Sequence, residues 1–333
     1  MKFRPWYRAW PETAALLFGI AWVPLLPRRA VVGLSRFAAK IAFKHANELR
    51  EIGRANLEIV FGEEKTQEER DDILMQSFQS FGLLVLDIIW FAFRTEKRLA
   101  TWFTWDESCA PLFADEAQLI LVAHYGNWEN MGQSYAAKGQ SIFSVAAPLK
   151  NQSADKIFIR IREKTGQQII PQQGAARKLL QGLKKKKKLA VLLDQNTKPK
   201  DGGLFVDVMG LPAPVSTAPA ALAVKTDTSV YTLTGTADAK GHYTATLHEI
   251  LAPRQDAEDP VAELTQRMTD SMAAVIRKQP GYWCWMYKRW ELIPEGQDQD
   301  RYPFYARKIE PGDMKKTAPE KVPDSGRFGI ESS

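Results

Sequence analysis

The sequence places a histidine and a glutamate five residues apart, in the segment His124-Tyr-Gly-Asn-Trp-Glu129. A neutral imidazole oriented by a carboxylate is a general base, which suits it to removing the proton of an alcohol. On a continuous helix the two side chains would point about 140° apart, so they can meet only if the chain turns between them. Gly126 permits such a turn, and Glu129 would then lie near a helix N-terminus, where a carboxylate is favourable. The structural alternative is a core histidine beside a helix-terminal glutamate.

The elements around this pair are those of an α/β protein, in which short apolar runs alternate with helical stretches. The expected strands are 118–123, 141–147, 168–171, 189–193 and 229–235, with a last strand pair around 231–250, and the expected helices are 127–138, 153–165, 174–187, 215–226 and 258–279. This alternation predicts a mixed, largely parallel sheet flanked by helices. Active sites in such sheets lie at the carboxyl ends of strands, and His124 directly follows one.

The chain before the expected sheet is helical and basic in character. Apolar residues recur at helical spacing over 30–43 and 73–93, and Thr66 followed by Glu69 is typical of a capping box. We divide the chain into a basic, apolar membrane-associating segment (1–45), a helical region (46–105), an α/β core (106–296) and a polar tail (297–333) that we expect to be disordered.

The positive charge of the protein is concentrated at its N-terminus. The 333 residues carry a net charge of +6, yet nine basic and two acidic residues give +7 within the first 50. The apolar run Thr13–Pro27 is about 15 residues long and contains Pro24, whereas a spanning helix needs roughly 20 apolar residues. Pro27-Arg28-Arg29 stands where a signal peptide would have small residues. We therefore expect a shallow or re-entrant anchor on anionic lipid, the alternative being an amphipathic helix packed on the domain.

Several functional classes lack support in the sequence. Cys109 and Cys284 lie far apart and form no metal-binding pair, and there is no Walker A loop, no GxGxxG after a strand and no HExxH. The run Lys184–Lys188 is more typical of a solvated helix end than of a nucleic-acid site, because no aromatic stacking motif accompanies it. We expect no cofactor, no metal and no nucleic-acid partner.

Five segments, in order, resemble the bacterial lipid A late acyltransferases, the lauroyl and myristoyl transferases. They are Val122–Glu129, Arg162–Gly166, Leu193–Gln195, Gly203–Ala223 and Pro280–Trp290, within a likeness that extends over roughly residues 10–292. Each segment is a loose motif by itself, but the five in this order are specific to the family.

The resemblance implies a glycerolipid-acyltransferase-like fold and acyl transfer from an acyl-acyl-carrier-protein thioester to a hydroxyl of a lipid A precursor. The reaction would take place at the cytoplasmic face of the inner membrane. His124 would be the base that deprotonates the 3-hydroxyl of a glucosamine-linked acyl chain, and Glu129 would hold His124. The further candidates are the backbone N–H groups around Gly126 and Asn127, or a nearby arginine, for the oxyanion, Arg162 and Arg177 for phosphate or carboxylate groups, and Asp194 and Gln195 as lining of the cleft.

Two departures from the family pattern put acceptor and chain-length specificity in doubt: Tyr287 stands where a histidine is common, and Val208-Met209 replaces an aromatic pair. Arg289 and the tryptophans around it could equally form a buried aromatic cluster. Two other functions stay open, namely acyl-coenzyme A dependent acylation of another glycolipid such as a phosphatidylinositol mannoside, and a catalytically silent membrane-binding protein.

Overall fold

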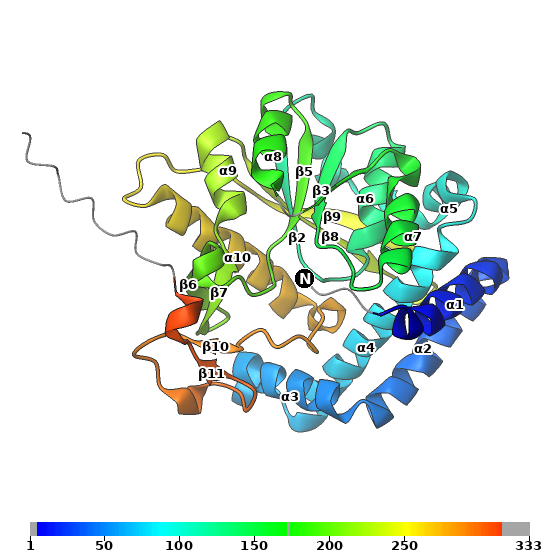
Figure 1. The fold of residues 1–333 in the computed structure, drawn as a ribbon, viewed down its shortest axis with the longest axis horizontal. Coiled ribbons are helices and arrows are strands. Elements are labelled where there is room, and N and C mark those ends of the chain that lie inside the picture. The colour runs from blue at the N-terminus through cyan, green and yellow to red at the C-terminus, as the bar shows by residue number, and fades with distance from the viewer. Residues whose placement is uncertain (1–4, 172–173, 315–333) are drawn as a thin grey trace, which may run out of the picture.

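The fold is built around one mixed sheet, seen in a computed structural model that describes residues 5–171 and 174–314 (Figure 1). Its strand order is β1-β9-β8-β2-β5-β3-β4. The strands are β1 (Phe103–Trp105), β2 (Gln118–Val122), β3 (Ile142–Ala146), β4 (Gln168–Pro171), β5 (Lys188–Leu192), β8 (Val230–Ala237) and β9 (Tyr243–Leu251). The strands β1 and β9 run against the other five, because β8 and β9 pair antiparallel while the other neighbours pair parallel. The predicted mixed, largely parallel sheet is confirmed.

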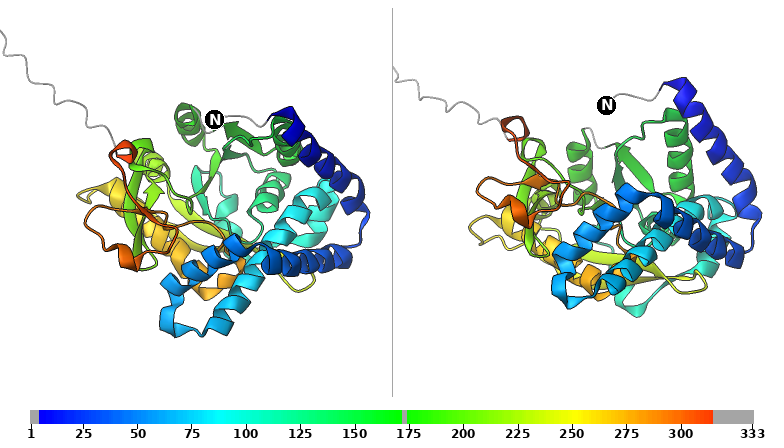
Figure 2. Two further views of the ribbon diagram at one scale, coloured as in Figure 1. Left: turned by 60° about the horizontal axis from the view of Figure 1, so that its bottom comes forward. Right: turned by 90° about the horizontal axis from the view of Figure 1, so that it is seen from below.

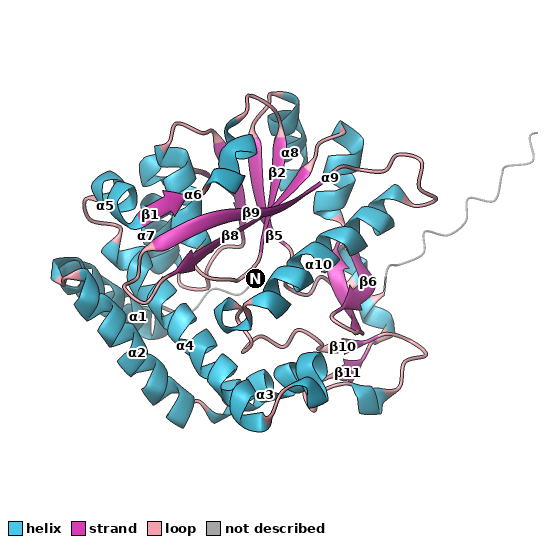
Figure 3. Ribbon diagram, turned by 180° about the vertical axis from the view of Figure 1, so that it is seen from behind, coloured by secondary structure: helices cyan, strands magenta, loops and turns pink. Residues whose placement is uncertain are grey.

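Helices cover both faces of this sheet, as Figure 3 shows from behind. They are α6 (Trp128–Ala137), α7 (Gln152–Arg162), α8 (Ala175–Lys184), α9 (Ala218–Thr226) and α10 (Pro260–Lys278). Alternate residues of β2 belong to two different apolar cores: Leu119 and Leu121 pack with α8, α9 and α10, whereas Ile120 and Val122 pack with α6. This double burial explains why β2 is continuously apolar from Leu119 to Val122 instead of alternating.

The sheet opens between two of its central strands. Along β3, only the first three residues, Ile142–Ser144, pair with β5, while the end of β3 pairs with β4 alone. The end of β5 pairs only with β2. The carboxyl ends of β3 and β5 therefore diverge, and we call the space between them the sheet split.

Five helices precede the sheet: α1 (Trp6–Trp22), α2 (Arg28–His45), α3 (Asn47–Phe61), α4 (Gln67–Trp90) and α5 (Thr95–Trp102). The capping box at Thr66 and Glu69 is confirmed at the start of α4. Among the described residues, α4 alone is long and apolar enough to cross a membrane, and half of its apolar window is buried inside the protein. Figure 2 shows α1, in dark blue, along the outer side of the molecule. There Asn151, which caps α7, donates to Ala9 and Glu12 of α1.

Two small β-structures lie outside the main sheet, a hairpin and a two-stranded parallel sheet. The hairpin of β6 (Gly203–Val208) and β7 (Leu211–Ser216) delays the start of α9 to Ala218, later than the predicted helix at 215–226. β10 (Leu292–Ile293) pairs with β11 (Arg307–Lys308). Residues 297–314, which we expected to be disordered, are packed, since Tyr302 and Asp313 are buried. The remainder of the predicted tail, 315–333, lies outside the described residues.

Candidate active site

The imidazole of His124 is held on one side by Asp194. These residues follow the neighbouring parallel strands β2 and β5, so the sheet brings both to the same edge. Nδ1 of His124 lies 2.8 Å from Oδ1 of Asp194. Oδ2 accepts hydrogen bonds from the backbone N–H of His124 at 2.9 Å and from the indole N–H of Trp283 at 2.8 Å. An ionised carboxylate only accepts, so Nδ1 carries the proton and Nε2 is left as the basic nitrogen.

The pair tunes the basicity of this nitrogen. Burial by itself would lower the pKa of His124, but the charge and hydrogen bond of Asp194, and more distantly Glu129, raise it above its ordinary value. Burial by itself would raise the pKa of Asp194, but His124 and Trp283 outweigh it and lower that pKa. Asp194 therefore stays ionised at neutral pH, which is the state that orients and strengthens a histidine base.

The basic nitrogen of His124 faces a polar donor and an aromatic ring. The amide nitrogen of Gln195 lies 3.2 Å from Nε2. The ring of Trp128 meets the imidazole edge to face at a centroid distance of 4.8 Å. Because Nε2 is the acceptor, Gln195 donates to it, at the position that a substrate hydroxyl must take for proton transfer.

Glu129 does not hold His124 as expected. Its carboxylate accepts two hydrogen bonds from Arg162, at 2.7 Å from Nε and 2.5 Å from Nη2. This bidentate pair forms because Glu129 lies in the first turn of α6 and Arg162 in the last turn of α7. The positioning contact expected from Glu129 is made by Asp194, and Glu129 influences His124 through its charge.

Gly126 and Asn127 form the predicted turn, but their N–H groups do not face the site. The N–H of Gly126 donates to the carbonyl of Tyr282 at 3.0 Å, and that of Asn127 to Gly235 at 2.8 Å. Gly126 has a φ of 59°, and a Cβ there would lie 2.1 Å from the carbonyl oxygen of Gly235. The expectation that these two N–H groups stabilise an oxyanion is therefore wrong, because both are already used within the fold.

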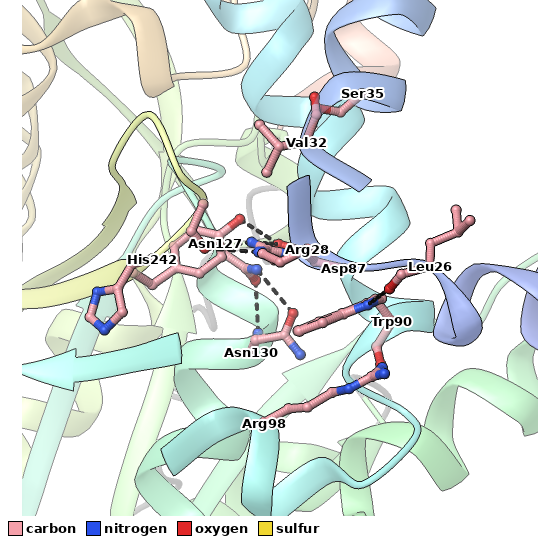
Figure 4. Close-up of polar contacts among 12 residues, drawn as sticks. Leu26, Arg28, Val32, Ser35, Asp87, Trp90, Arg98, Asn127, Asn130 and His242 are labelled. Atoms are coloured by element: carbon pink, nitrogen blue, oxygen red, sulfur yellow. Dashed lines mark hydrogen bonds and ion pairs between the residues drawn. The ribbon is translucent and has the colours of Figure 1, made fainter. Parts of the chain in front are cut away.

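A second buried pair lies behind this turn (Figure 4). The carboxylate of Asp87, on α4, accepts from both terminal nitrogens of Arg28, the first residue of α2, and from the hydroxyl of Tyr243 at 2.7 Å. Burial raises the pKa of Asp87, and its hydrogen-bonding neighbours Arg28, Tyr243 and Asn127 oppose that rise. The side chain of Asn127 also caps α6 by accepting from the N–H of Asn130. The network thus joins α2 and α4 to the start of α6. It also removes Arg28 from the basic surface expected of the N-terminus.

A cavity of about 970 Å³ lies beside His124 and brings most of the predicted site residues together. Five of them line it: His124, Glu129, Arg162, Arg177 and Gln195. Asp194 lies behind His124, and Gly126 and Asn127 are buried in the turn. Most of the exposed lining is apolar, which suits a hydrocarbon chain. Within residues 5–171 and 174–314, no cluster of His, Cys, Asp and Glu could hold a metal ion.

The C-terminal segment contributes residues whose roles the sequence did not reveal. Trp283 donates to Asp194, and the hydroxyl of Tyr287 accepts from the N–H of Asn196 at 2.9 Å. Arg289 is fully buried and donates to the side chain of Asn196. Trp285 is buried in the core, so this segment is both aromatic core and support for the site. The motif 280–290 was visible in the sequence, but which of its members face Asp194 depends on folding.

Comparison with known proteins identifies the family of the chain. The chain matches the family described as bacterial lipid A biosynthesis acyltransferase over residues 2–291, which confirms the resemblance seen in the sequence. It is 23% identical over 229 residues to a phosphatidylinositol mannoside acyltransferase of Mycobacterium tuberculosis, covering 66% of this chain and 71% of that protein. It is 23% identical over 189 residues to the protein of the same name from Mycolicibacterium smegmatis, covering 56% and 60%. The protein is thus an acyltransferase, and it belongs to the bacterial lipid A biosynthesis acyltransferase family.

Proposed function

We propose that the protein transfers a fatty acyl chain from acyl-acyl carrier protein to a hydroxyl of a lipid A precursor. The observation that carries the proposal is the orientation of His124. Its Nδ1 is fixed by a buried carboxylate, and its Nε2 faces a largely apolar cavity of about 970 Å³. A base beside a space for hydrocarbon suits the deprotonation of a hydroxyl for attack on an acyl thioester.

In the proposed reaction His124 first acts as base and then as acid. Nε2 takes the proton of the acceptor hydroxyl, and the oxygen forms a bond to the thioester carbonyl carbon. When the tetrahedral intermediate collapses, the carbon–sulfur bond breaks and the proton on Nε2 goes to the thiolate. Asp194 stabilises the imidazolium that exists between these steps, as its effect on the pKa of His124 indicates.

Two side chains on the cavity wall can stabilise the oxyanion. Gln195 has its amide nitrogen beside Nε2 of His124, and Arg162 lines the same cavity with its guanidinium fixed by Glu129. Arg162 is held in place before the reaction and needs no rearrangement as charge develops, whereas Gln195 becomes available when the acceptor hydroxyl displaces it from Nε2. In this arrangement Glu129 acts through Arg162, and Arg162 is a donor to the reacting carbonyl or to an acceptor phosphate.

We further propose that the exposed face of α1 and α2 rests on the cytoplasmic face of the inner membrane. Exposed apolar side chains project from these helices and from the turn between them, which holds Leu25: Trp10, Leu17, Phe18, Trp22, Leu25, Leu34, Phe37 and Ile41. Arg29, Arg36, Lys40 and Lys44 are exposed on α2 among them. Apolar side chains interspersed with cations are typical of a surface that binds anionic lipid. The cavity rim includes Leu149, two residues before the Asn151 that binds α1, so the rim lies close to this face.

Surface substitutions test the membrane proposal. Phe18→Ser combined with Leu25→Ser should reduce sedimentation of the protein with vesicles containing anionic lipid. Phe304→Ser, which changes a side chain equally exposed elsewhere on the molecule, is the matched control. Unchanged sedimentation of the double variant would show that this face does not bind the membrane.

The reaction is tested with the purified full-length protein and radiolabelled donors. Transfer to a lipid A precursor from acyl carrier protein but not from coenzyme A, abolished by His124→Ala, is the expected result. No transfer with either donor and any lipid acceptor would favour a membrane-binding protein without catalysis.

A second candidate is acyl transfer from acyl-coenzyme A to a phosphatidylinositol mannoside. It is favoured by the names of the two mycobacterial relatives. Transfer from coenzyme A to that glycolipid, with none to a lipid A precursor, would replace the first proposal by this one.

A further inference from the structure

The cavity beside His124 extends onto both faces of the sheet. Ala190 and Leu192 of β5 line it on the face covered by α6, and Val191 lines it on the opposite face. Val145 and Ala146, at the end of β3, line it as well. A continuous parallel ladder would keep these faces apart, but β3 and β5 no longer pair here. The cavity therefore passes through the sheet split.

One part of the cavity is closed. It lies between the sheet and α6 and is lined by Ile120, Met131, Tyr135, Ile142 and Leu233, each 5% exposed or less. We call this part the inner lobe. A chain that enters it meets the aromatic ring of Tyr135, whose hydroxyl is fixed by a hydrogen bond to the carbonyl of Leu112. A closed apolar space of this kind limits the length of the chain that it accepts.

The other part of the cavity is open. It lies between α8 and α9 and is lined by Leu179, Leu180, Ala218, Ala221 and Leu222; we call it the outer lobe. Leu180 and Leu222 are only partly buried, and Ala218 is exposed. Two exposed cations, Arg177 and Lys225, border the outer lobe and line the same cavity. An open apolar groove with cations suits a chain that remains attached to a larger anionic molecule.

We propose that the two lobes bind two different hydrocarbon chains, and this assignment rests on the proposed function. The donor acyl chain occupies the inner lobe, and an apolar chain of the acceptor occupies the outer lobe. The two chains meet beside Gln195, which follows β5 and contacts Nε2 of His124. An acceptor hydroxyl carried on an acyl chain needs such a second apolar site next to the base, whereas a sugar hydroxyl does not.

The chain offers a matched pair of substitutions for the test. Ala190 and Ala221 are both partly buried and line the inner and the outer lobe respectively. Ala190→Leu and Ala221→Leu each add three carbon atoms to one lobe. Each variant is first compared with the unchanged protein by melting temperature, so that a folding defect is recognised.

Two assays, applied to the unchanged protein and to each variant, separate the lobes. One measures release of fatty acid from acyl-acyl carrier protein without acceptor, where water would replace the hydroxyl, and the other measures transfer to a lipid A precursor. Ala190→Leu should shift the preferred donor by two or more carbons toward shorter chains in both reactions. Ala221→Leu should raise the KM for the acceptor tenfold or more without shifting the preferred length of the donor chain.

A shortened acceptor completes the design. Replacing the long 3-hydroxyacyl chain of the precursor by 3-hydroxybutyryl should raise the KM of the unchanged protein tenfold or more, but that of Ala221→Leu by less than threefold. The assignment is overturned if Ala221→Leu changes donor length preference, or if the unchanged protein is insensitive to acceptor chain length. Failure of the unchanged protein to react with any thioester would instead overturn the proposed function itself.

Discussion

The protein contains two buried carboxylates that are paired with basic side chains, and the difference between them is instructive. In the pair of Arg28 and Asp87, all three guanidinium nitrogens donate hydrogen bonds. Nη1 donates to Asp87, Nε donates to the carbonyl of Gly241, and Nη2 donates to both. In the pair of His124 and Asp194, only Nδ1 is held by the carboxylate and Nε2 faces the cavity. A saturated pair can fix helices together, whereas a pair whose second nitrogen meets only the displaceable amide of Gln195 in the cavity can also react.

The two pairs are also linked through one short turn. Asp194 accepts from the backbone of His124, at the start of the turn, and Asn127, at its end, is a hydrogen-bonding neighbour of Asp87. The saturated pair therefore lies where it can support the position of the reactive one. Substitutions in each pair should separate an effect on catalysis from an effect on folding.

The largest expected effect is that of His124→Ala on catalysis. Loss of a general base lowers kcat/KM by about 10²–10⁴-fold. The melting temperature is compared as well and should fall, because the variant leaves the buried carboxylate of Asp194 without its imidazole partner. Both are measured on the purified protein, by transfer of labelled acyl chains and by thermal unfolding. Retention of more than a tenth of the activity would exclude His124 as the base.

Asp87→Ala should act on the fold instead. It leaves the guanidinium of Arg28 buried without its partner, which costs about 3–5 kcal/mol of unfolding free energy. Urea unfolding measures this loss. The double variant Arg28→Met with Asp87→Leu should recover a large part of it, since replacing both charges by apolar groups removes the unpaired charge. If Asp87→Ala unfolds no more easily than the unchanged protein, the pair is not the structural tie described above.

Asp194→Asn should alter both the rate and its dependence on pH. Loss of a hydrogen bond to a charged group costs about 1.5–3 kcal/mol, so we expect kcat to fall about ten- to a hundredfold. Because Asp194 raises the pKa of His124, its removal lowers that pKa and moves the acidic limb of the pH–rate profile to lower pH. An acidic limb that stays in place would show that another group titrates there.

The same linkage predicts how stability depends on pH. The raised pKa of His124 means that its pair contributes stability at acidic pH, and this contribution is lost as pH rises through that pKa. The lowered pKa of Asp194 sets the acidic limit of this contribution, because the stability that the ionised carboxylate provides is lost as pH falls through that pKa. Unfolding free energies of the unchanged protein and Asp194→Asn should therefore differ most between these two limits. A difference that is independent of pH would contradict the ionic pairing.

Glu129→Gln should have the smallest effect. It weakens the bidentate grip on Arg162 and removes a charge that raises the pKa of His124, so we expect about a tenfold loss in kcat/KM. Arg162→Lys, which keeps the charge but not the fork geometry, should show a loss of similar size. A loss as large as that of His124→Ala would mean that Glu129 takes part directly in the proton transfer.

The sequence alone predicted the sheet and the position of His124 well, because strand composition and spacing are local properties. It did not predict the partner of His124. Glu129 is close in sequence, but Asp194 is close in space, since the parallel pairing of β2 and β5 sets the ends of the two strands side by side. The same reason applies to Trp283, which reaches Asp194 from a segment 89 residues further along the chain.

The N-terminal charge shows a second limit of reading the sequence. Counting identifies a basic segment, but it cannot tell that Arg28 is buried against Asp87 while Arg29 is exposed. Lys188, counted among the solvated lysines, is likewise 3% exposed and donates to the carbonyls of Ala114 and Glu116. Only tertiary contacts separate the cations that are bound within the fold from those that stay exposed to solvent.

The contact of Gly126 with Gly235 has a consequence for protein design. The turn after β2 crosses β8 so closely that the carbonyl of Gly235 occupies the space of a side chain at 126. A Cβ at Gly235 would in turn press on Phe103 and Met131, at 3.2 and 3.3 Å. Grafting the histidine segment alone onto another parallel sheet should therefore fail. The smallest transferable unit is the turn together with a neighbouring strand that has glycine at the crossing point.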